Sequence, residues 1–333
     1  MANTVSTLTY PRLLGDIGGT NARLAWAHEA GAPLSDIASY RCAEHGSLAA
    51  AIQRYLSDHG KQQGPRACAI GIANPVTGDE VRMTNHHWSF SIASLKKELA
   101  VNRLAVVNDF TALALSLPAL GPDELLPLGP GAAIADEAMA VLGPGTGLGV
   151  SGLLPAPGGG YLPVAGEGGH STLAANDAQE AAVIEWLRGR FGHVSAERVL
   201  SGPGLVNLYE AAAGLAGQAA LTLTPAEIVD GARHSGDPLC RLAIELFCRF
   251  LGSFAGNVAL TLGARGGVYI GGGIAPRLLP ELRASRFRER FEGKGRFQAY
   301  LAQIPCWLIN AEVSPALIGA SRALDIERFC ARA

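Results

Sequence analysis

The stretch LLGDIGGTNARLAWA, residues 13–27, sets the pattern by which the rest of the chain can be interpreted. Two short apolar runs, 13–17 and 22–27, flank the segment 18–21, which is typical of two strands joined by a tight turn in which glycine supplies a positive φ. Residues 141–154, VLGPGTGLGVSGLL, repeat this plan later in the chain. The repeat predicts two domains of similar topology that face each other across a cleft.

Between and after these hairpins, strand-like and helix-like patterns alternate. Ser47 is placed to cap a helix, residues 67–73 and 104–108 have the composition of buried strands, and 110–117 follows as a helix. Further helices are predicted to start at two capping sequences and to fill one long apolar stretch: Asp177 onward, Thr224 onward, and 238–262. The alternation predicts an α/β protein.

Composition excludes several classes of protein. The 333 residues are 48% hydrophobic and 17% charged, which excludes disorder and predicts two domains or one large one. Lys and Arg number 27 against 29 Asp and Glu, and no basic stripe is present, so nucleic acid is not expected as a partner. Apolar stretches are interrupted before about 20 residues, so no membrane partner or secretion signal is expected.

The six cysteines favour a reducing compartment. They include no C-x-x-C pair and no zinc-like spacing, which is typical of reduced thiols in a cytoplasmic protein.

Each glycine turn offers successive backbone N–H groups to a phosphate, and Thr20 and Thr146 add hydroxyl donors. No P-loop is present, because no glycine is followed by Lys-Ser or Lys-Thr at the required spacing. A G-x-G-x-x-G match at Gly147, Gly149 and Gly152 continues into a proline-rich strand rather than a helix, so it does not predict a dinucleotide fold.

Six motifs in order carry a resemblance to a known family. Residues 15–21 and 143–149 resemble the two phosphate motifs of the actin-like sugar kinases, and 269–274 resembles their adenosine motif. Between them lie 108–109, 167–170 and 195–202. The set is similar to the bacterial ATP-dependent glucokinase family over about 13–323. It implies two actin-like (ribonuclease H-like) α/β domains flanking a central cleft: a small domain of 13–119 plus 311–330, and a large domain of 120–310.

The resemblance implies ATP and Mg²⁺ as cofactors. Asp16 is the expected magnesium carboxylate, through water, although a turn aspartate bonding local amides is the alternative. The residues expected at the nucleotide are Asp16, Gly18, Gly19, Thr20, Asn21, Gly145, Thr146, Gly147, Gly272 and Gly273. Pro144 departs from the family pattern, because it is expected inside the second phosphate turn, where it removes one N–H.

The same resemblance assigns the sugar site. Asp109 is the expected general base toward the 6-hydroxyl of glucose, with helix capping as its alternative role. The expected sugar contacts are Asn108, Asp109, Glu167, His170, Glu197 and Asn85. The alternative role for Glu167 and His170 is metal ligation. The alternative for Glu197 is an ordinary position in a helix capped by Ser195.

The implied activity is transfer of the ATP γ-phosphoryl to O6 of D-glucose by a homodimer. No zinc is expected, because residues 171–174 lack the cysteine cluster that related kinases carry after the histidine. The alternatives are a kinase for mannose, fructose or glucosamine, a donor other than ATP such as ADP or polyphosphate, and a sugar-responsive regulator of the same fold. That regulator would need a helix-turn-helix domain before the first strand, where about a dozen residues stand.

Overall fold

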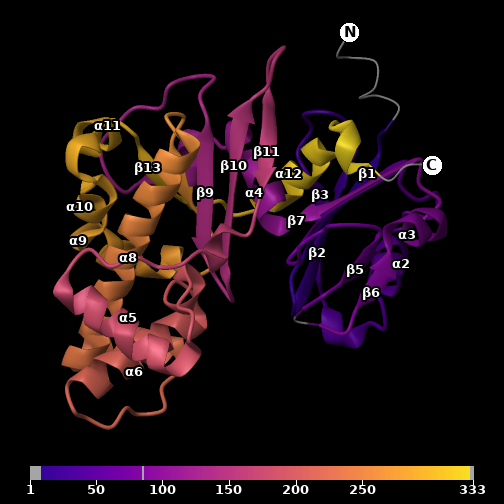
Figure 1. Ribbon diagram of the computed structural model, residues 1–333. Coiled ribbons are helices and arrows are strands. Elements are labelled where there is room, and N and C mark those ends of the chain that lie inside the picture. Colours follow the sequence, from indigo (N-terminus) through magenta and orange to yellow (C-terminus); the bar gives the residue numbers. More distant parts are fainter. Residues whose placement is uncertain (1–8, 85, 331–333) are drawn as a thin grey trace. The chain divides into compact units, whose positions relative to one another are not determined.

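The computed structural model describes residues 9–84 and 86–330, which form two compact units. The first unit contains the described residues up to Gly121 and from Ala311 onward, and the second is Pro122–Asn310. The α/β class predicted from the alternating patterns is confirmed in both units (Figure 1).

The first unit is built on a five-stranded sheet of order β3-β2-β1-β4-β7. Its strands are β1 (Arg12–Ile17), β2 (Asn21–Ala27), β3 (Ser35–Arg41), β4 (Ala67–Ile72) and β7 (Arg103–Asn108). The predicted hairpin is confirmed, with β1 and β2 antiparallel, whereas β1, β4 and β7 run parallel. A short hairpin of β5 (Glu80–Arg82) and β6 (Ser89–Ser91) stands apart from this sheet.

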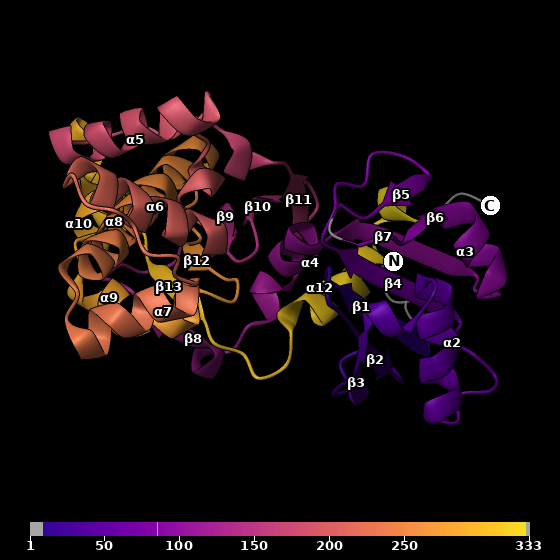
Figure 2. The same cartoon turned by 90° about the horizontal axis from the view of Figure 1, so that it is seen from below.

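Helices cover both faces of the first sheet. One face packs on α2 (Leu48–Asp58) and α3 (Ile92–Glu98), and the side chain of Ser47 caps α2 as predicted. The other face packs on α4 (Asp109–Ser116) and α12 (Pro315–Ala323), which lie side by side in Figures 1 and 2. A Cβ at Gly319 would collide with the carbonyl of Ala112, so glycine is required for this close approach.

The second unit repeats the same plan in a sheet of order β11-β10-β9-β12-β13-β8. Strands β9 and β10 form the predicted second hairpin, and β12 and β13 follow in parallel beside β9. The strands are β8 (Leu125–Pro127), β9 (Met139–Pro144), β10 (Leu148–Pro155), β11 (Tyr161–Ala165), β12 (Val268–Ile270) and β13 (Cys306–Ile309). The similar topology predicted from the internal repeat is therefore confirmed.

The helices of the second unit surround α8 (Pro238–Leu262), whose predicted bounds are confirmed. The others are α5 (Ala178–Phe191), α6 (Gly202–Leu215), α7 (Pro225–Asp230), α9 (Leu279–Ala284), α10 (Phe287–Glu292) and α11 (Gln298–Ala302). Asp177 caps α5, and Thr224 with Glu227 forms a capping box at α7, as the sequence predicted.

Of the described helices, α8 alone is long and apolar enough to cross a membrane by length and composition, although Arg249, Gly252 and Asn257 interrupt its apolar runs as the sequence analysis expected. Most of this helix is buried, and the buried Arg249 on it pairs with Glu180 of α5. Its apolar surface is thus explained by the core of the second unit.

One expectation about the first hairpin is wrong. Neither Gly18 nor Gly19 has a positive φ. The strands close at Ile17 opposite Ala22, which leaves a four-residue loop, and Gly18 N donates to the Asn21 carbonyl at 2.9 Å. A loop of this length is commonly built around a type I turn, which needs no positive φ.

Candidate functional site

Polar side chains gather at the carboxyl edge of the first sheet. The register aligns Ile17, Ile72 and Asn108 across the parallel strands β1, β4 and β7. Asp16 and Asp109 are sequence neighbours of two of these residues, so the topology brings both carboxylates to one edge. Ligands of α/β proteins characteristically bind at this edge.

Asn108 and Asp109 begin α4 with different roles. Asn108 is the N-cap, and its Oδ1 accepts from Phe110 N at 2.9 Å and Thr111 N at 3.2 Å. Asp109 is the first helical residue, and its Oδ1 accepts from Phe110 N at 2.9 Å and from Asn108 Nδ2 at 3.0 Å. The capping role considered for Asp109 therefore belongs to Asn108, and the carboxylate of Asp109 is held in one orientation.

Asp16 is held by two side chains that the sequence analysis did not single out. Its Oδ2 accepts from Ser314 Oγ at 2.7 Å and from Arg23 Nη1 at 3.2 Å. Ser314 is the residue before α12, separated from Asp16 by 298 positions, so no local pattern relates the two. Arg23 is the cross-strand partner of Asp16, and this pairing follows from the hairpin formed by residues 13–17 and 22–27.

Each glycine turn has one residue, Gly18 or Gly145, that is open where a side chain would stand. A Cβ on Gly18 or Gly145 would have only one distant backbone oxygen within 4 Å. Thr20 is exposed, and its carbonyl accepts from Cys42 N at 2.9 Å. Backbone without side chains is suited to close approach by a phosphate.

In the second unit, Glu197 lies against the second glycine turn. Its Oε2 accepts from Leu148 N at 3.0 Å, and a Cβ on Gly147 would collide with the same carboxylate. Ser195 does not cap the short helical turn Ala196–Arg198, so Glu197 is not a residue of a helix capped by Ser195. The Glu197 carboxylate is therefore positioned by a residue that lies 49 positions earlier in the sequence.

Glu167 precedes one helical turn, Gly168–His170, and His170 ends it; both side chains are exposed. His170 Nδ1 lies 3.9 Å from Glu197 Oε1. The segments that carry His170 and Glu197 are joined by a backbone hydrogen bond, in which Ala196 N donates to the Ser171 carbonyl at 2.9 Å. The structure therefore brings His170 and Glu197 together, with Glu167 at the other end of the same turn.

Metal ligation was an alternative for Glu167 and His170. In the part of the chain that the structure describes, no group of three His, Cys, Asp or Glu side chains is arranged to hold a metal ion.

The third glycine cluster lies beside the second turn. Gly271 N donates to the Leu142 carbonyl at 2.8 Å, and Gly272, with φ of 77°, packs against the carbonyl of Pro144. Pro144 itself is the last residue of β9 and pairs with Leu148, so it belongs to the strand rather than to the turn. Gly202 N, at the start of α6, donates to the Gly145 carbonyl at 2.9 Å.

A cavity of about 410 Å³ lies next to this cluster, and the sequence analysis missed it. Its walls are mainly apolar and come from α6, α7 and the segment 274–278, with Arg233 and Arg277 among the lining residues. Arg233 is paired with Glu281 at 2.7 Å. Such a mixture of apolar walls and a few polar groups suits a planar heterocycle.

Asn85, predicted as a sugar contact, lies outside the described residues. Its neighbour Thr84 donates its backbone N–H to the buried Asn74 Oδ1 at 3.1 Å, which ties this segment to the end of β4.

Two α/β units of one topology, each with a glycine turn in its central hairpin, define the class of two-domain actin-like sugar kinases. The family model described as Glucokinase matches residues 13–326. The chain belongs to the glucokinase family.

Individual relatives support this assignment. The chain is 55% identical over 317 residues to the glucokinase of Aromatoleum aromaticum, covering 95% of each chain. A glucokinase structure from an Antarctic psychrotroph has a TM-score of 0.86 at 37% identity, covering 94% of this chain and 98% of the other. The glucokinase of the ROK family from Streptomyces griseus, solved with glucose and AMPPNP, has a TM-score of 0.61 at 18% identity, covering 94% and 99%, which shows the shared fold.

Proposed function

We propose that the protein is an ATP-dependent glucokinase, which transfers the γ-phosphoryl group of ATP to O6 of D-glucose and releases glucose 6-phosphate and ADP. The observation that carries this proposal is the 55% identity with a curated glucokinase over 95% of both chains.

Asp109 is proposed as the general base that accepts the proton of the 6-hydroxyl as O6 attacks the γ-phosphorus. Two hydrogen bonds to its Oδ1, from Phe110 N and Asn108 Nδ2, support this role because they fix the carboxylate before the sugar arrives. A fixed base needs little reorganisation in the transition state, which lowers the barrier.

The remaining sugar contacts are proposed from the predicted set. Asn108 gives one amide proton to Asp109, and an amide has a second proton for a sugar hydroxyl. Glu167, His170 and Glu197 are proposed to bind other hydroxyls, which is supported by the exposure of Glu167 and His170 and by the proximity of His170 to Glu197. Asn85 stays a prediction for the same role.

The ATP phosphates are proposed to bind the two glycine turns, at Gly18, Gly19, Thr20 and Asn21 and at Gly145, Thr146 and Gly147. Gly272 and Gly273 are proposed to face the adenosine, with its base in the neighbouring 410 Å³ cavity. Asp16 fits a magnesium role, since an oriented carboxylate is a ligand type that Mg²⁺ prefers. When bound, Mg²⁺ would neutralise phosphate charge during transfer.

A cytoplasmic homodimer is proposed from the family resemblance. Sedimentation equilibrium of the purified chain tests the dimer directly, and a single species of monomer mass would refute it.

The activity is tested by a coupled assay over glucose, mannose, fructose and glucosamine, each with ATP, ADP or polyphosphate and Mg²⁺. Glucose with ATP is expected to give the highest kcat/KM. If millimolar glucose and Mg·ATP yield no glucose 6-phosphate, the proposed function is wrong, whereas faster turnover of another sugar would assign a different hexose kinase.

A further inference from the structure

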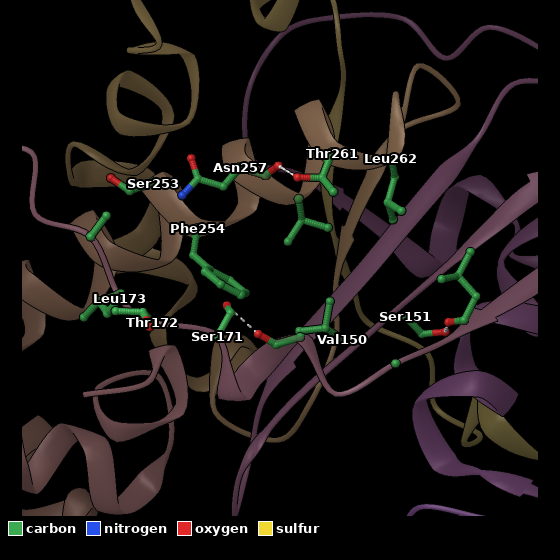
Figure 3. Close-up of a pocket in the computed structure, with 15 residues that line it drawn as sticks. Val150, Ser151, Ser171, Thr172, Leu173, Ser253, Phe254, Asn257, Thr261 and Leu262 are labelled. Atoms are coloured by element: carbon green, nitrogen blue, oxygen red, sulfur yellow. Dashed lines mark hydrogen bonds between the residues drawn. The ribbon is translucent and has the colours of Figure 1, made fainter. Parts of the chain in front are cut away.

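A second cavity of the second unit lies behind the turn that carries Glu167 and His170. It has a volume of about 340 Å³ and is bounded by the C-terminal half of α8, strands β10 and β11, and the segment 166–174. Figure 3 shows Phe254 extending from α8 toward Ser171 and Val150 on the opposite wall. The volume corresponds to roughly ten liquid water molecules at about 30 Å³ each, so it suits a small organic molecule.

The lining chemistry excludes the substrates of the proposed reaction. None of the fifteen described residues that line the cavity is charged. Two titratable side chains that are not part of the lining bond to it: His193 Nε2 lies 3.0 Å from Thr172 Oγ1, and Lys294 Nζ donates to the Ser253 carbonyl at 3.0 Å. A phosphate or nucleotide would lose hydration there without gaining a counter-charge, which is unfavourable.

The hydroxyl groups of the lining define what an occupant must offer. Ser151 Oγ donates to the Val164 carbonyl at 2.8 Å, Ser171 Oγ to the Gly168 carbonyl at 2.7 Å, and Thr261 Oγ1 to the Asn257 carbonyl at 2.8 Å. Because these three protons are committed, those oxygens accept from a ligand, whereas the side-chain amide of Asn257 and the hydroxyl of Ser253, which accepts from Asn176 Nδ2 at 2.7 Å, also carry protons that can be donated. Most of the lining residues are apolar, so the many hydroxyls of a sugar would find few partners and a sugar fits this surface poorly.

The cavity lies directly against the turn that carries the residues proposed to bind the sugar. Gly166, Gly168, Ser171 and Thr172 line it and flank Glu167 and His170 in sequence. Gly168 lies so close to Val150 that a Cβ would stand 3.1 Å from that side chain. An occupant that shifts Val150 therefore acts directly on the turn at Gly168.

We propose that this cavity is an effector site for a small, uncharged, largely apolar molecule with one hydrogen-bond donor, and that its occupancy changes glucose affinity through the turn Gly168–His170. The coupling rests on the proposed function, since Glu167 and His170 must bind the sugar. By thermodynamic linkage, glucose must change the affinity for the occupant by the same factor.

Phenol is the probe, because it is an apolar ring with one donor. We expect phenol to bind the full chain saturably in the absence of glucose and ATP, with a Kd of about 1 mM, measured by calorimetry or ligand-observed NMR. Benzoate, which adds a charge, should not bind, and anisole, which lacks the donor, should bind several-fold more weakly.

Ala174→Trp fills the cavity from an exposed position on its lining, and Ala133→Trp is the matched control at an exposed alanine elsewhere in the second unit. We expect at least a tenfold loss of phenol affinity in Ala174→Trp and none in Ala133→Trp. Thr261→Trp blocks the same cavity from α8 and replaces Ala174→Trp if that variant does not fold.

Saturating phenol should change the glucose Kd about fivefold in the wild type and not in the blocked variant. Equal phenol binding to both tryptophan variants, equal binding of benzoate, or no saturable binding would overturn the site. Phenol binding that appears only on dilution to monomers would instead assign the cavity to a second copy of the chain. An unchanged glucose Kd would overturn the coupling. If the wild type makes no glucose 6-phosphate but binds phenol as described, the proposed function fails and the site stands.

Discussion

The side-chain amide of Asn108 donates to the carboxylate of Asp109, with Nδ2 3.0 Å from Oδ1. The adjacent residues divide two tasks that one aspartate would otherwise combine. Asn108 caps the helix with its carbonyl oxygen and orients its neighbour with its nitrogen, so Asp109 is not required as the cap. This division makes the base assignment testable without loss of the fold.

Asp109→Asn should abolish proton acceptance while α4 remains capped by Asn108. Turnover is expected to fall by about 10²- to 10⁴-fold, the usual contribution of a general base. Glucose binding measured by calorimetry should stay within about tenfold, because an amide still bonds the hydroxyl. The thermal midpoint should be nearly unchanged, and turnover close to that of the wild type would remove the base assignment.

Substitutions of Asn108 separate capping from orientation. Asn108→Ala removes both, so it should destabilise the protein by about 0.5–2 kcal/mol and also lower turnover. Asn108→Ser restores an N-cap oxygen but not the amide that orients Asp109. We expect near-normal stability with reduced turnover in the serine variant, measured by urea unfolding and steady-state kinetics. Equal turnover of Asn108→Ser and the wild type would contradict the orienting role.

Ser314→Ala should weaken the use of Mg·ATP. The hydroxyl donates to a charged carboxylate at 2.7 Å, a type of bond that contributes about 1.5–3 kcal/mol, so the KM for Mg·ATP is expected to rise by about tenfold or more. Ser321→Ala is the control on the same helix, because the Ser321 hydroxyl accepts from Arg12 instead. Ser314→Thr should restore the wild-type KM. A similar rise in both alanine variants would indicate a general effect of α12.

Removal of zinc should not inactivate the enzyme. Dialysis against a zinc chelator followed by return of Mg²⁺ is expected to leave kcat and KM unchanged, since the described residues contain no three-residue metal cluster. Metal analysis before and after dialysis is the accompanying measurement. Activity that returns only with zinc would restore metal ligation as the role of Glu167 and His170.

Glu281, which pairs with Arg233 at the cavity proposed for adenine, makes the stability of the protein depend on pH. Its hydrogen bond with Arg233 lowers the pKa of the carboxyl below its ordinary value of 4.5. A lowered folded pKa means that the added stability is complete above pH 4.5 and is lost as pH falls through the folded pKa. At pH 7 the free energy of unfolding of Glu281→Gln, measured in urea, should therefore be lower than that of the wild type by about 1 kcal/mol or less. The two proteins should converge in strong acid, and a difference that persists there would contradict the ionic origin.

Local order was encoded in the sequence. The two glycine hairpins, the bounds of α8 and the caps at Ser47, Asp177 and Thr224 were all predicted from residues a few positions apart. Such features depend on backbone hydrogen bonds and apolar periodicity within one element, which short-range patterns report directly. The resemblance of six ordered motifs then supplied the fold that joins these elements.

Only the tertiary structure decided which side chains share an environment. Ser314 meets Asp16 across 298 positions, and Glu197 meets Leu148 across 49, because α12 returns to the first sheet and a short turn folds onto β10. The choice of Asn108 over Asp109 as the cap depends on where β7 ends, to within one residue. The two cavities are lined from segments far apart in the chain. These relationships arise from packing between elements, and no short-range pattern specifies which surfaces will meet.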